Sequence, residues 1–480
     1  MGRRDLLLGA AILAIAALPR IAAAIAYRPA LFYSDSWAYV TMAYGPNHWD
    51  PTRPSGYAFV LLALGKVTHS LAAVTTLQHV GGLALVALVY WLALRLGVRR
   101  VVAAGTALVV GLDAWLIVLE QSPMAETAFT LTLVGALALA VGAAPSRWWL
   151  FAASGALLAF ACTTRAAALF AVPVWLAYIA WRSRRLLALA AATLAFAVPL
   201  AVYVAEYHHV YGVWGLSAAN GWFRYGRVAQ LADCERFEPS AATRRLCQSD
   251  TERQGRRPIF YLWNETSPAR KAFGEVSGDP HENALLRDFA SRVVRSRPVD
   301  YAQMLASDFA GYFIPGRSSP GTSDVAITFP EQPRRGPFLN VKARDRYEPA
   351  YEPAVHAPAA LVRGYAKVFH TPRWLLAIAL AAVLAQAVLA LVTRRRRVFA
   401  HTPEVLLFAG VAVGMLLGST TTSAFVVRYL VPAAPLLLLA GAVALTELVA
   451  ARSTERALRS GAGTPLESAP PRPASAVQAT

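Results

Sequence analysis

Charged residues are scarce in this chain of 480 residues, where they make up only 15% of the sequence. A soluble globular protein carries about 25% charged residues, so a soluble multidomain enzyme is excluded. Disorder is also excluded, because 56% of the residues are hydrophobic. The chain has only 3 cysteines, which excludes a small secreted domain held together by disulfides. The mean hydropathy of +0.42 and the long apolar runs indicate instead that lipid surrounds most of the chain.

Lysine is nearly absent as well, so arginine supplies almost all of the 46 basic residues. The lysines are Lys66, Lys271, Lys342 and Lys367. This preference, together with abundant alanine, is typical of a GC-rich bacterial genome. The formal net charge is +18. Nucleic-acid binding would need these basic residues gathered on one soluble face. They stand mainly at the ends of apolar segments, so we expect no nucleic acid among the partners.

Apolar stretches close to the length that crosses a bilayer predict about ten transmembrane helices and therefore an all-α integral membrane bundle. The predicted segments are 6–26, 71–96, 101–119, 124–144, 148–164, 166–181, 186–205, 374–392, 405–420 and 429–448. The first segment lacks a clear small-residue cleavage site followed by a soluble domain, so we expect it to be a retained anchor.

Basic residues flank these segments mainly on one side, which the positive-inside rule assigns to the cytoplasm. With the N-terminus inside, the cytoplasmic side receives Arg3, Arg4, Arg95, Arg99, Arg100, Arg147, Arg182, Arg184, Arg185, Arg394 to Arg397, Arg452, Arg456 and Arg459. The short exterior connections receive Arg20, Arg28, Arg53, Lys66, Arg165 and Arg428. We therefore expect a multi-pass protein of a bacterial plasma membrane, in contact with membrane lipids and with both termini in the cytoplasm.

This topology divides the chain into four parts. Residues 1–205 form an N-terminal membrane core whose first exterior loop is 27–70. Residues 206–371 form an exterior insertion, in which 282–297 and 301–313 have helical patterns. Residues 372–450 form the C-terminal membrane helices. Residues 451–480, rich in Ala, Pro and Ser at their end, are expected to be a disordered cytoplasmic tail.

The cysteines follow the same division. Cys234 and Cys247 fall in the exterior insertion, an oxidising compartment in which a disulfide between them is expected. Cys162 falls within a membrane segment, where packing is the expected role. Cysteines and histidines show no metal-site spacing, so no metal ligand is proposed from the sequence.

Ionisable residues gather at the exterior ends of the first membrane segments. An ionisable side chain at membrane depth is costly, and its presence marks a candidate functional site. The acids are Asp35, Asp50, Asp113, Glu120 and Glu126, and the arginines are Arg53, Arg165 and Arg428. For Asp50, Asp113, Glu120 and Glu126 we expect a place in a donor or acceptor site, with solvated loop residues as the alternative.

Asp35 and the arginines suit complementary chemistry. Aromatic residues flank Asp35 in the stretch 31–39, and the resulting loss of hydration is expected to raise its pKa and make it a stronger base. The planar guanidinium of arginine binds phosphate in a bidentate manner and keeps its charge. Arg165 and Arg428 stand where the positive-inside trend would not put them, with snorkelling to lipid headgroups as the alternative explanation.

In their order along the chain, these motifs resemble those of the GT-C glycosyltransferases that use polyprenyl-phosphate sugars, such as protein O-mannosyltransferases and the aminoarabinose transferase of lipid A. The resemblance covers roughly the first 200 residues and the last helix. The matching stretches are Tyr33 to Tyr39, Thr52-Arg53-Pro54-Ser55-Gly56-Tyr57, Leu88 to Leu96, Glu120 to Glu126, Thr164-Arg165 to Pro173 and Arg428 to Leu438.

The resemblance implies a role for individual residues. Asp35 falls at the position of the family's catalytic acid, and Arg53 and Arg165 match basic residues implied to contact the lipid phosphate. Where the family often has Asp-Glu, this chain has Asp35-Ser36, so we expect a single carboxylate base. The implied partners are a polyprenyl-phosphate-linked sugar donor and a glycan, lipid or protein acceptor of the cell envelope. No cofactor is assigned from the sequence, and a divalent metal is left open.

Two other functions are compatible with the pattern. A transporter or flippase for lipid-linked sugars would also use charges at membrane depth, although the sequence shows no internal repeat of the kind expected for transporters. A non-catalytic membrane scaffold with an exterior binding domain would leave the acids at the rim unexplained.

Overall fold

The computed structural model describes residues 2–33, 35–45, 47–314, 327–332, 354–393, 399–423 and 426–459. These residues form helices and no β-strand. Parts of the predicted first loop and insertion lie outside them, as do two further predictions. Arg394 to Arg397, which the sequence predicts to be cytoplasmic, lie outside the described residues. Of the tail predicted for residues 451–480, the structure describes only the end of a helix, up to Arg459.

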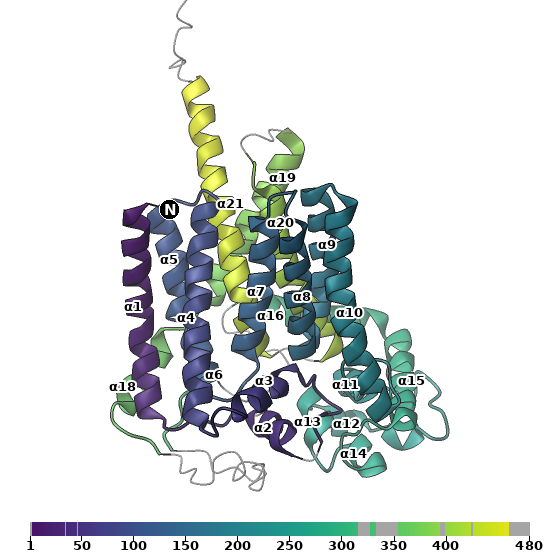
Figure 1. The fold of residues 1–480 in the computed structure, drawn as a ribbon. Coiled ribbons are helices and arrows are strands. Elements are labelled where there is room, and N and C mark those ends of the chain that lie inside the picture. The colour runs from purple at the N-terminus through teal and green to yellow at the C-terminus, as the bar shows by residue number, and fades with distance from the viewer. Residues whose placement is uncertain are drawn as a thin grey trace, which may run out of the picture.

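Long apolar helices stand side by side and form the main body of the protein (Figure 1). They are α1 (Arg3–Ala26), α4 (Leu71–Arg95), α5 (Arg100–Gly111), α6 (Ala114–Glu120), α7 (Glu126–Gly142), α8 (Trp148–Thr164), α9 (Val172–Ser183), α10 (Leu186–Tyr211), α19 (Arg373–Thr393), α20 (Thr402–Thr422) and α21 (Leu430–Arg459). Short 3₁₀ helices precede α9 and α21, namely η1 (Ala166–Ala171) and η4 (Val427–Tyr429).

Within the part of the chain that the structure describes, seven helices are long and apolar enough to cross a membrane, or eight if α5 and α6 together form one bent span. The predicted count of about ten also included α7 and α8, which have only 17 residues each. The segment predicted for 101–119 is not one straight helix, because α5 and α6 meet at an angle of 48°. The carboxylate of Asp113 accepts hydrogen bonds from the backbone N–H groups of Trp115 and Leu116 and so begins a new helix.

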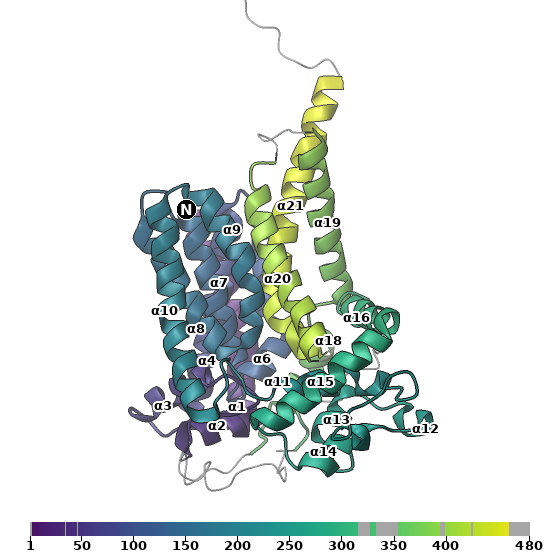
Figure 2. The same cartoon turned by 90° about the vertical axis from the view of Figure 1, so that its right-hand side faces the viewer.

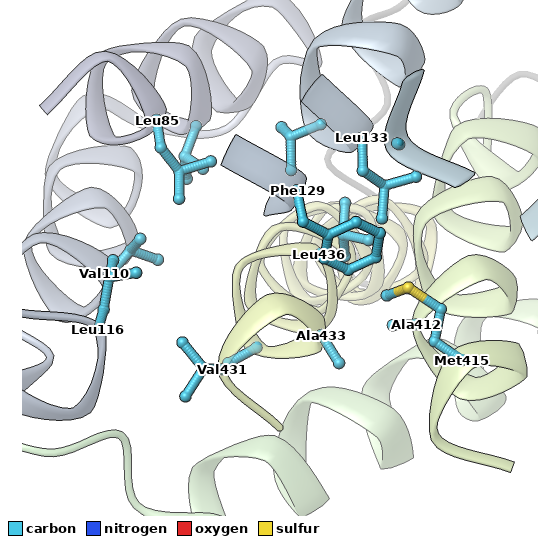
Figure 3. Packing of buried hydrophobic residues seen from close by; sticks show 14 of the residues in the cluster. Leu85, Val110, Leu116, Phe129, Leu133, Ala412, Met415, Val431, Ala433 and Leu436 are labelled. Carbon is cyan, nitrogen blue, oxygen red and sulfur yellow. The ribbon is translucent and has the colours of Figure 1, made fainter. Parts of the chain in front are cut away.

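The centre of the bundle is α21, which packs on α4, α5, α7, α19 and α20. In the most apolar stretch of 18 residues, 72% is buried in α21, against 17% in α10 at the edge of the bundle. Figure 3 shows Phe129 and Leu133 of α7 close to Leu436 of α21, with Met415 of α20 beside them. Close packing of these apolar side chains holds the C-terminal helices against the N-terminal ones.

One end of the bundle carries the shorter helices, and we call it the insertion end (Figure 2). The N-terminus of α1 and the C-terminal part of α21 lie at the opposite end (Figure 1). The helices at the insertion end are α2 (Ser36–Tyr44), α3 (Gly56–Gly65), α11 (Asn220–Val228), α12 (Asp250–Arg253), α13 (Pro258–Trp263), α14 (Pro268–Phe273), α15 (Pro280–Ser296), α16 (Pro298–Gly311) and α18 (Ala359–Val368), with the 3₁₀ turns η2 (Ala229–Leu231) and η3 (Arg244–Leu246).

The insertion has a hydrophobic core of its own, formed by buried residues between Ala219 and Val293. Its longest helix, α15, begins where the Asp279 carboxylate accepts a hydrogen bond from the Glu282 N–H and Pro280 occupies the first turn, a typical helix start. The structure joins Cys234 and Cys247 in a disulfide. The helical patterns predicted from the sequence correspond to α15 and α16.

A buried ion pair joins two helices of the insertion where they meet the bundle. Arg227 Nη1 of α11 lies 2.5 Å from Asp308 Oδ2 of α16, and both side chains are almost completely buried. Both helices pack on α20. Each charge depends on the other, because removal of either would leave an unpaired charge away from water.

We predict that Asp308→Ala lowers the free energy of unfolding by about 3–5 kcal/mol, because it leaves the Arg227 guanidinium buried without a counter-charge. The double variant Arg227→Met/Asp308→Leu should recover most of the loss. The control is Asp288→Ala, which removes a half-exposed pair with Arg292 and should cost about 1 kcal/mol or less. Equal losses for the two alanine variants, measured by denaturant unfolding in detergent, would contradict the prediction.

Candidate functional site

Four separate parts of the chain bring charged residues together at the insertion end. Asp35 stands directly before α2, and Glu126 is the first residue of α7. Arg165 adopts an extended backbone conformation that ends α8, and Arg428 lies in η4 directly before α21. Helix ends therefore place these side chains at one level of the bundle. Asp50 and Arg53 join them from the loop that connects α2 to α3.

These six side chains form a continuous line of ion pairs, which we call the charge ladder. Its first half lies in the loops. Arg53 Nη1 is 3.2 Å from Asp50 Oδ2, and Arg53 Nη2 is 3.1 Å from Asp35 Oδ1. The other oxygen of Asp35, Oδ2, is 2.8 Å from Arg428 Nη2. Asp35 is thus held between two guanidinium groups that come from distant parts of the sequence.

The second half of the charge ladder lies at the helix ends. Arg428 Nε is 3.1 Å from Glu126 Oε1, and the same oxygen is paired with Arg165 Nη2. The Glu126 side chain is completely buried, whereas the arginines keep 12–17% of their side chains exposed. Acids and arginines alternate along the line, which is therefore close to neutral.

Aromatic rings cover the arginines. The ring of Tyr429 lies 6.0 Å from the guanidinium carbons of both Arg165 and Arg428, and the ring of Tyr33 lies 5.9 Å from that of Arg428. Cation–π contacts of this kind favour a charged group that has lost part of its water. Among the described residues, Arg165 Nε is buried without a hydrogen-bond partner, as is Glu126 Oε2. The Nε–H group of Arg165 is therefore a hydrogen-bond donor that the site leaves unused.

The pKa of Asp35 differs from the sequence expectation. Burial raises this pKa as predicted, but Arg428 and Arg53, with Arg165 further away, lower it more, and the net pKa lies well below its ordinary value. The prediction of a raised pKa is therefore wrong. The sequence showed the aromatic neighbours of Asp35 but not the two arginines that the fold places on either side of it.

Asp113 and Glu120 form hydrogen bonds and ion pairs with residues outside the charge ladder. Asp113 Oδ2 accepts hydrogen bonds from the N–H and hydroxyl of Thr371, while Oδ1 caps α6. Glu120 Oε1 lies 2.8 Å from Arg20 Nη2, and its Oε2 is 2.8 Å from His79 Nδ1. The structure thus does not join these two acids to the charge ladder. It also corrects the placement of Arg20 in an exterior connection, because Arg20 lies within α1 and is buried.

Sequence reasoning missed the remaining members of this second cluster, which we call the buried network. It consists of Arg20, Gln78, His79, Glu120 and Gln121. A signal was present, since Gln78 and His79 interrupt the apolar run of α4. In the structure Gly82 leaves room for the network, because a Cβ atom there would collide with the Glu120 carboxylate.

The buried network holds two segments of the charge ladder. The backbone O of Gln121 accepts a hydrogen bond from Leu31 N at 2.8 Å, and its side-chain Nε2 donates to Tyr27 O at 2.9 Å, shortly before Asp35. Gln78 Nε2 donates to the carbonyls of Glu120 and Ser122 at 2.7 and 2.6 Å, shortly before Glu126. The network therefore supports the ladder from within the bundle.

A divalent metal finds no ready set of ligands in the described part of the chain, where no group of three or more His, Cys, Asp or Glu side chains comes together. The acids of the charge ladder are each paired with arginine. The residues present fit an anion better than a cation, because three guanidinium groups converge on one site.

Comparisons with known proteins give little further information. No protein-family model matches the chain, and no curated protein matches it. Among solved structures, the chain is similar to the Saccharomyces cerevisiae protein O-mannosyltransferase Pmt1–Pmt2 complex bound to its sugar donor, at 15% identity and a TM-score of 0.35. The similarity covers 47% of this chain and 36% of that one. At this TM-score it carries no argument about function, so the function must be argued from the site.

We predict that Asp35 stays ionised throughout the physiological pH range. A lowered folded-state pKa gives stability that is present above the unfolded value of about 3.9 and is lost as the pH falls through the folded pKa. The difference in unfolding free energy between wild type and Asp35→Asn should thus be constant from about pH 8 to pH 5 and shrink below about pH 4. A difference that already closes between pH 7 and pH 5 would show that the pKa is raised instead.

Proposed function

We propose that this protein is a membrane glycosyltransferase that moves a sugar from a polyprenyl-phosphate donor to an acceptor hydroxyl at the insertion end, on the exterior face of the membrane. The observation that carries the proposal is the charge ladder, in which Arg53 and Arg428 flank Asp35 while Arg165 and Arg428 share Glu126. Guanidinium groups suit a phosphate, and their position at the end of an apolar bundle suits a phosphate attached to lipid. The resemblance found in the sequence motifs points to the same chemistry.

In the proposed reaction, Asp35 takes the proton from the acceptor hydroxyl. The oxygen of that hydroxyl attacks the anomeric carbon of the donor sugar. The bond from that carbon to the phosphate oxygen breaks on the opposite side, so the configuration inverts. The bonding electrons leave with the polyprenyl phosphate, whose negative charge the arginines stabilise. A phosphate leaves without a general acid, so one carboxylate is sufficient, unlike the two used in glycoside hydrolysis.

The low pKa of Asp35 in the free protein is compatible with this scheme, because a bound donor changes the surroundings of the Asp35 carboxylate. An incoming phosphate competes with Asp35 for the N–H groups of Arg53 and Arg428. As those ion pairs weaken, less positive charge acts on the carboxylate and its pKa rises, so it becomes a better base. Asp35 thus becomes a stronger base once the leaving group is in place.

We predict that Asp35→Asn lowers transfer by about 10²- to 10⁴-fold, the usual loss on removing a general base, while donor binding is retained. Purified protein would be incubated with labelled polyprenyl-phosphate sugars, including mannose and arabinofuranose donors. The matched control is Asp300→Asn, a partly exposed acid of α16 paired with Arg297, and it should leave transfer unchanged. Turnover that survives in Asp35→Asn would overturn the assignment of the base.

The same assay in liposomes separates the other functions. A glycosylated product supports the transferase, movement of the labelled lipid between leaflets without product supports a flippase, and neither supports a scaffold. The buried network, with its charges inside the bundle, is the feature that a flippase would use.

A further inference from the structure

Three tyrosines stand in a row on α10, close to the insertion end. Tyr203, Tyr207 and Tyr211 are four residues apart and therefore lie on one face of the helix. The ring centroids are 6.2 Å apart for the first pair and 4.9 Å for the second. We call them the tyrosine row. A row of this kind usually only packs, but here the hydroxyl groups have a common target.

All three hydroxyls bond to the backbone of one loop, residues 49–55. Tyr211 donates to Trp49 O at 3.2 Å, and Tyr207 donates to Asp50 O at 3.1 Å. Tyr203 accepts a hydrogen bond from Ser55 N at 3.0 Å. The ring of Trp49 also packs edge-on against Tyr203 and Tyr207. The tyrosine row thus holds both ends of the loop that carries Arg53.

Within the loop, Asp50 passes this constraint on to Arg53. Asp50 Oδ1 accepts hydrogen bonds from Thr52 N at 2.7 Å and from Arg53 N at 3.2 Å, and Oδ2 is 3.2 Å from Arg53 Nη1. Asp50 therefore fixes both the backbone and the side chain of Arg53. Its contacts are those of a residue that positions another rather than of one that awaits a substrate.

The beginning of the insertion holds the same loop from another side. Gly212, with φ of 66°, ends α10 in the left-handed conformation that suits glycine. The chain then turns back, and the N–H groups of Ala218 and Ala219 donate to Pro51 O at 2.9 and 2.8 Å. The loop is thus enclosed between the end of α10 and the first residues of the insertion.

We infer that Tyr203, Tyr207 and Tyr211 are positioning residues that place Arg53, through Asp50, for contact with the phosphate of the donor. The inference rests on the proposed function for the identity of that anion. The physical need is clear, because loops are mobile and arginine is long, whereas an error of about 1 Å in a catalytic group can cost about 100-fold in rate. Hydroxyl groups on a rigid helix remove that freedom.

Hydrogen exchange of the full-length protein in detergent tests the inference without any ligand. Tyr203→Phe keeps the ring but removes the acceptor of the Ser55 N–H, so that amide should exchange at least about tenfold faster. The control is Tyr90→Phe. Tyr90 belongs to α4, and its hydroxyl donates a hydrogen bond to Asp5 O at 3.4 Å near the opposite end of the bundle. Loop exchange that is unchanged in Tyr203→Phe would overturn the inference.

A double-mutant cycle tests whether the tyrosines act through Arg53. The probe is decaprenyl monophosphate, with decaprenol as the comparison that isolates binding of the phosphate. Tyr207→Phe should weaken binding of the monophosphate about tenfold in the wild-type background and about twofold or less in Arg53→Gln, because non-additive effects identify residues that act together. Tyr90→Phe should change neither value.

The outcomes distinguish the two proposals. If the wild-type protein binds decaprenol as tightly as decaprenyl monophosphate, the proposed function fails, whatever hydrogen exchange shows. If the monophosphate is preferred but Tyr207→Phe weakens binding equally in both backgrounds, the proposed function stands and the positioning inference fails. A purely structural role would give equal losses of this kind.

Discussion

Every charge placed in or beside an apolar bundle needs a partner, because a lone charge away from water costs several kcal/mol. The charge ladder meets this requirement with acids and arginines that come from four parts of the chain. Its ion pairs consequently fix the positions of the first loop, the start of α7, the end of α8 and the start of α21 relative to one another. The same contacts that satisfy the charges also assemble the candidate site.

Preorganised charge is what transfer to or from a phosphate requires. Guanidinium groups that are already oriented need little reorganisation when negative charge develops on a leaving group. Here the orientation has two supports. The buried network ties down the segments before Asp35 and Glu126, and the tyrosine row ties down the loop of Arg53. Both supports are anchored on helices of the bundle, which are more rigid than loops.

The insertion takes part in this architecture. It has its own core, yet its first residues bond to the loop of Arg53 and its buried ion pair lies where it meets α20. An acceptor held by the insertion would therefore lie near the charge ladder. This arrangement gives a physical reason for a large insertion directly after α10.

The helices and the charges of the candidate site can be predicted from the amino-acid sequence. Long apolar runs predict helices because their backbone must be satisfied internally in lipid, and the costly rim charges Asp35, Arg53, Arg165 and Arg428 stand out from them. The pairing of these charges depends on the fold. The pKa of Asp35 depends on Arg428, and the role of Glu120 depends on Arg20, residues that are far away along the chain. Local sequence reports the desolvation of a carboxylate but not the cations that the fold brings to it, and around Asp35 the arginines together outweigh the desolvation.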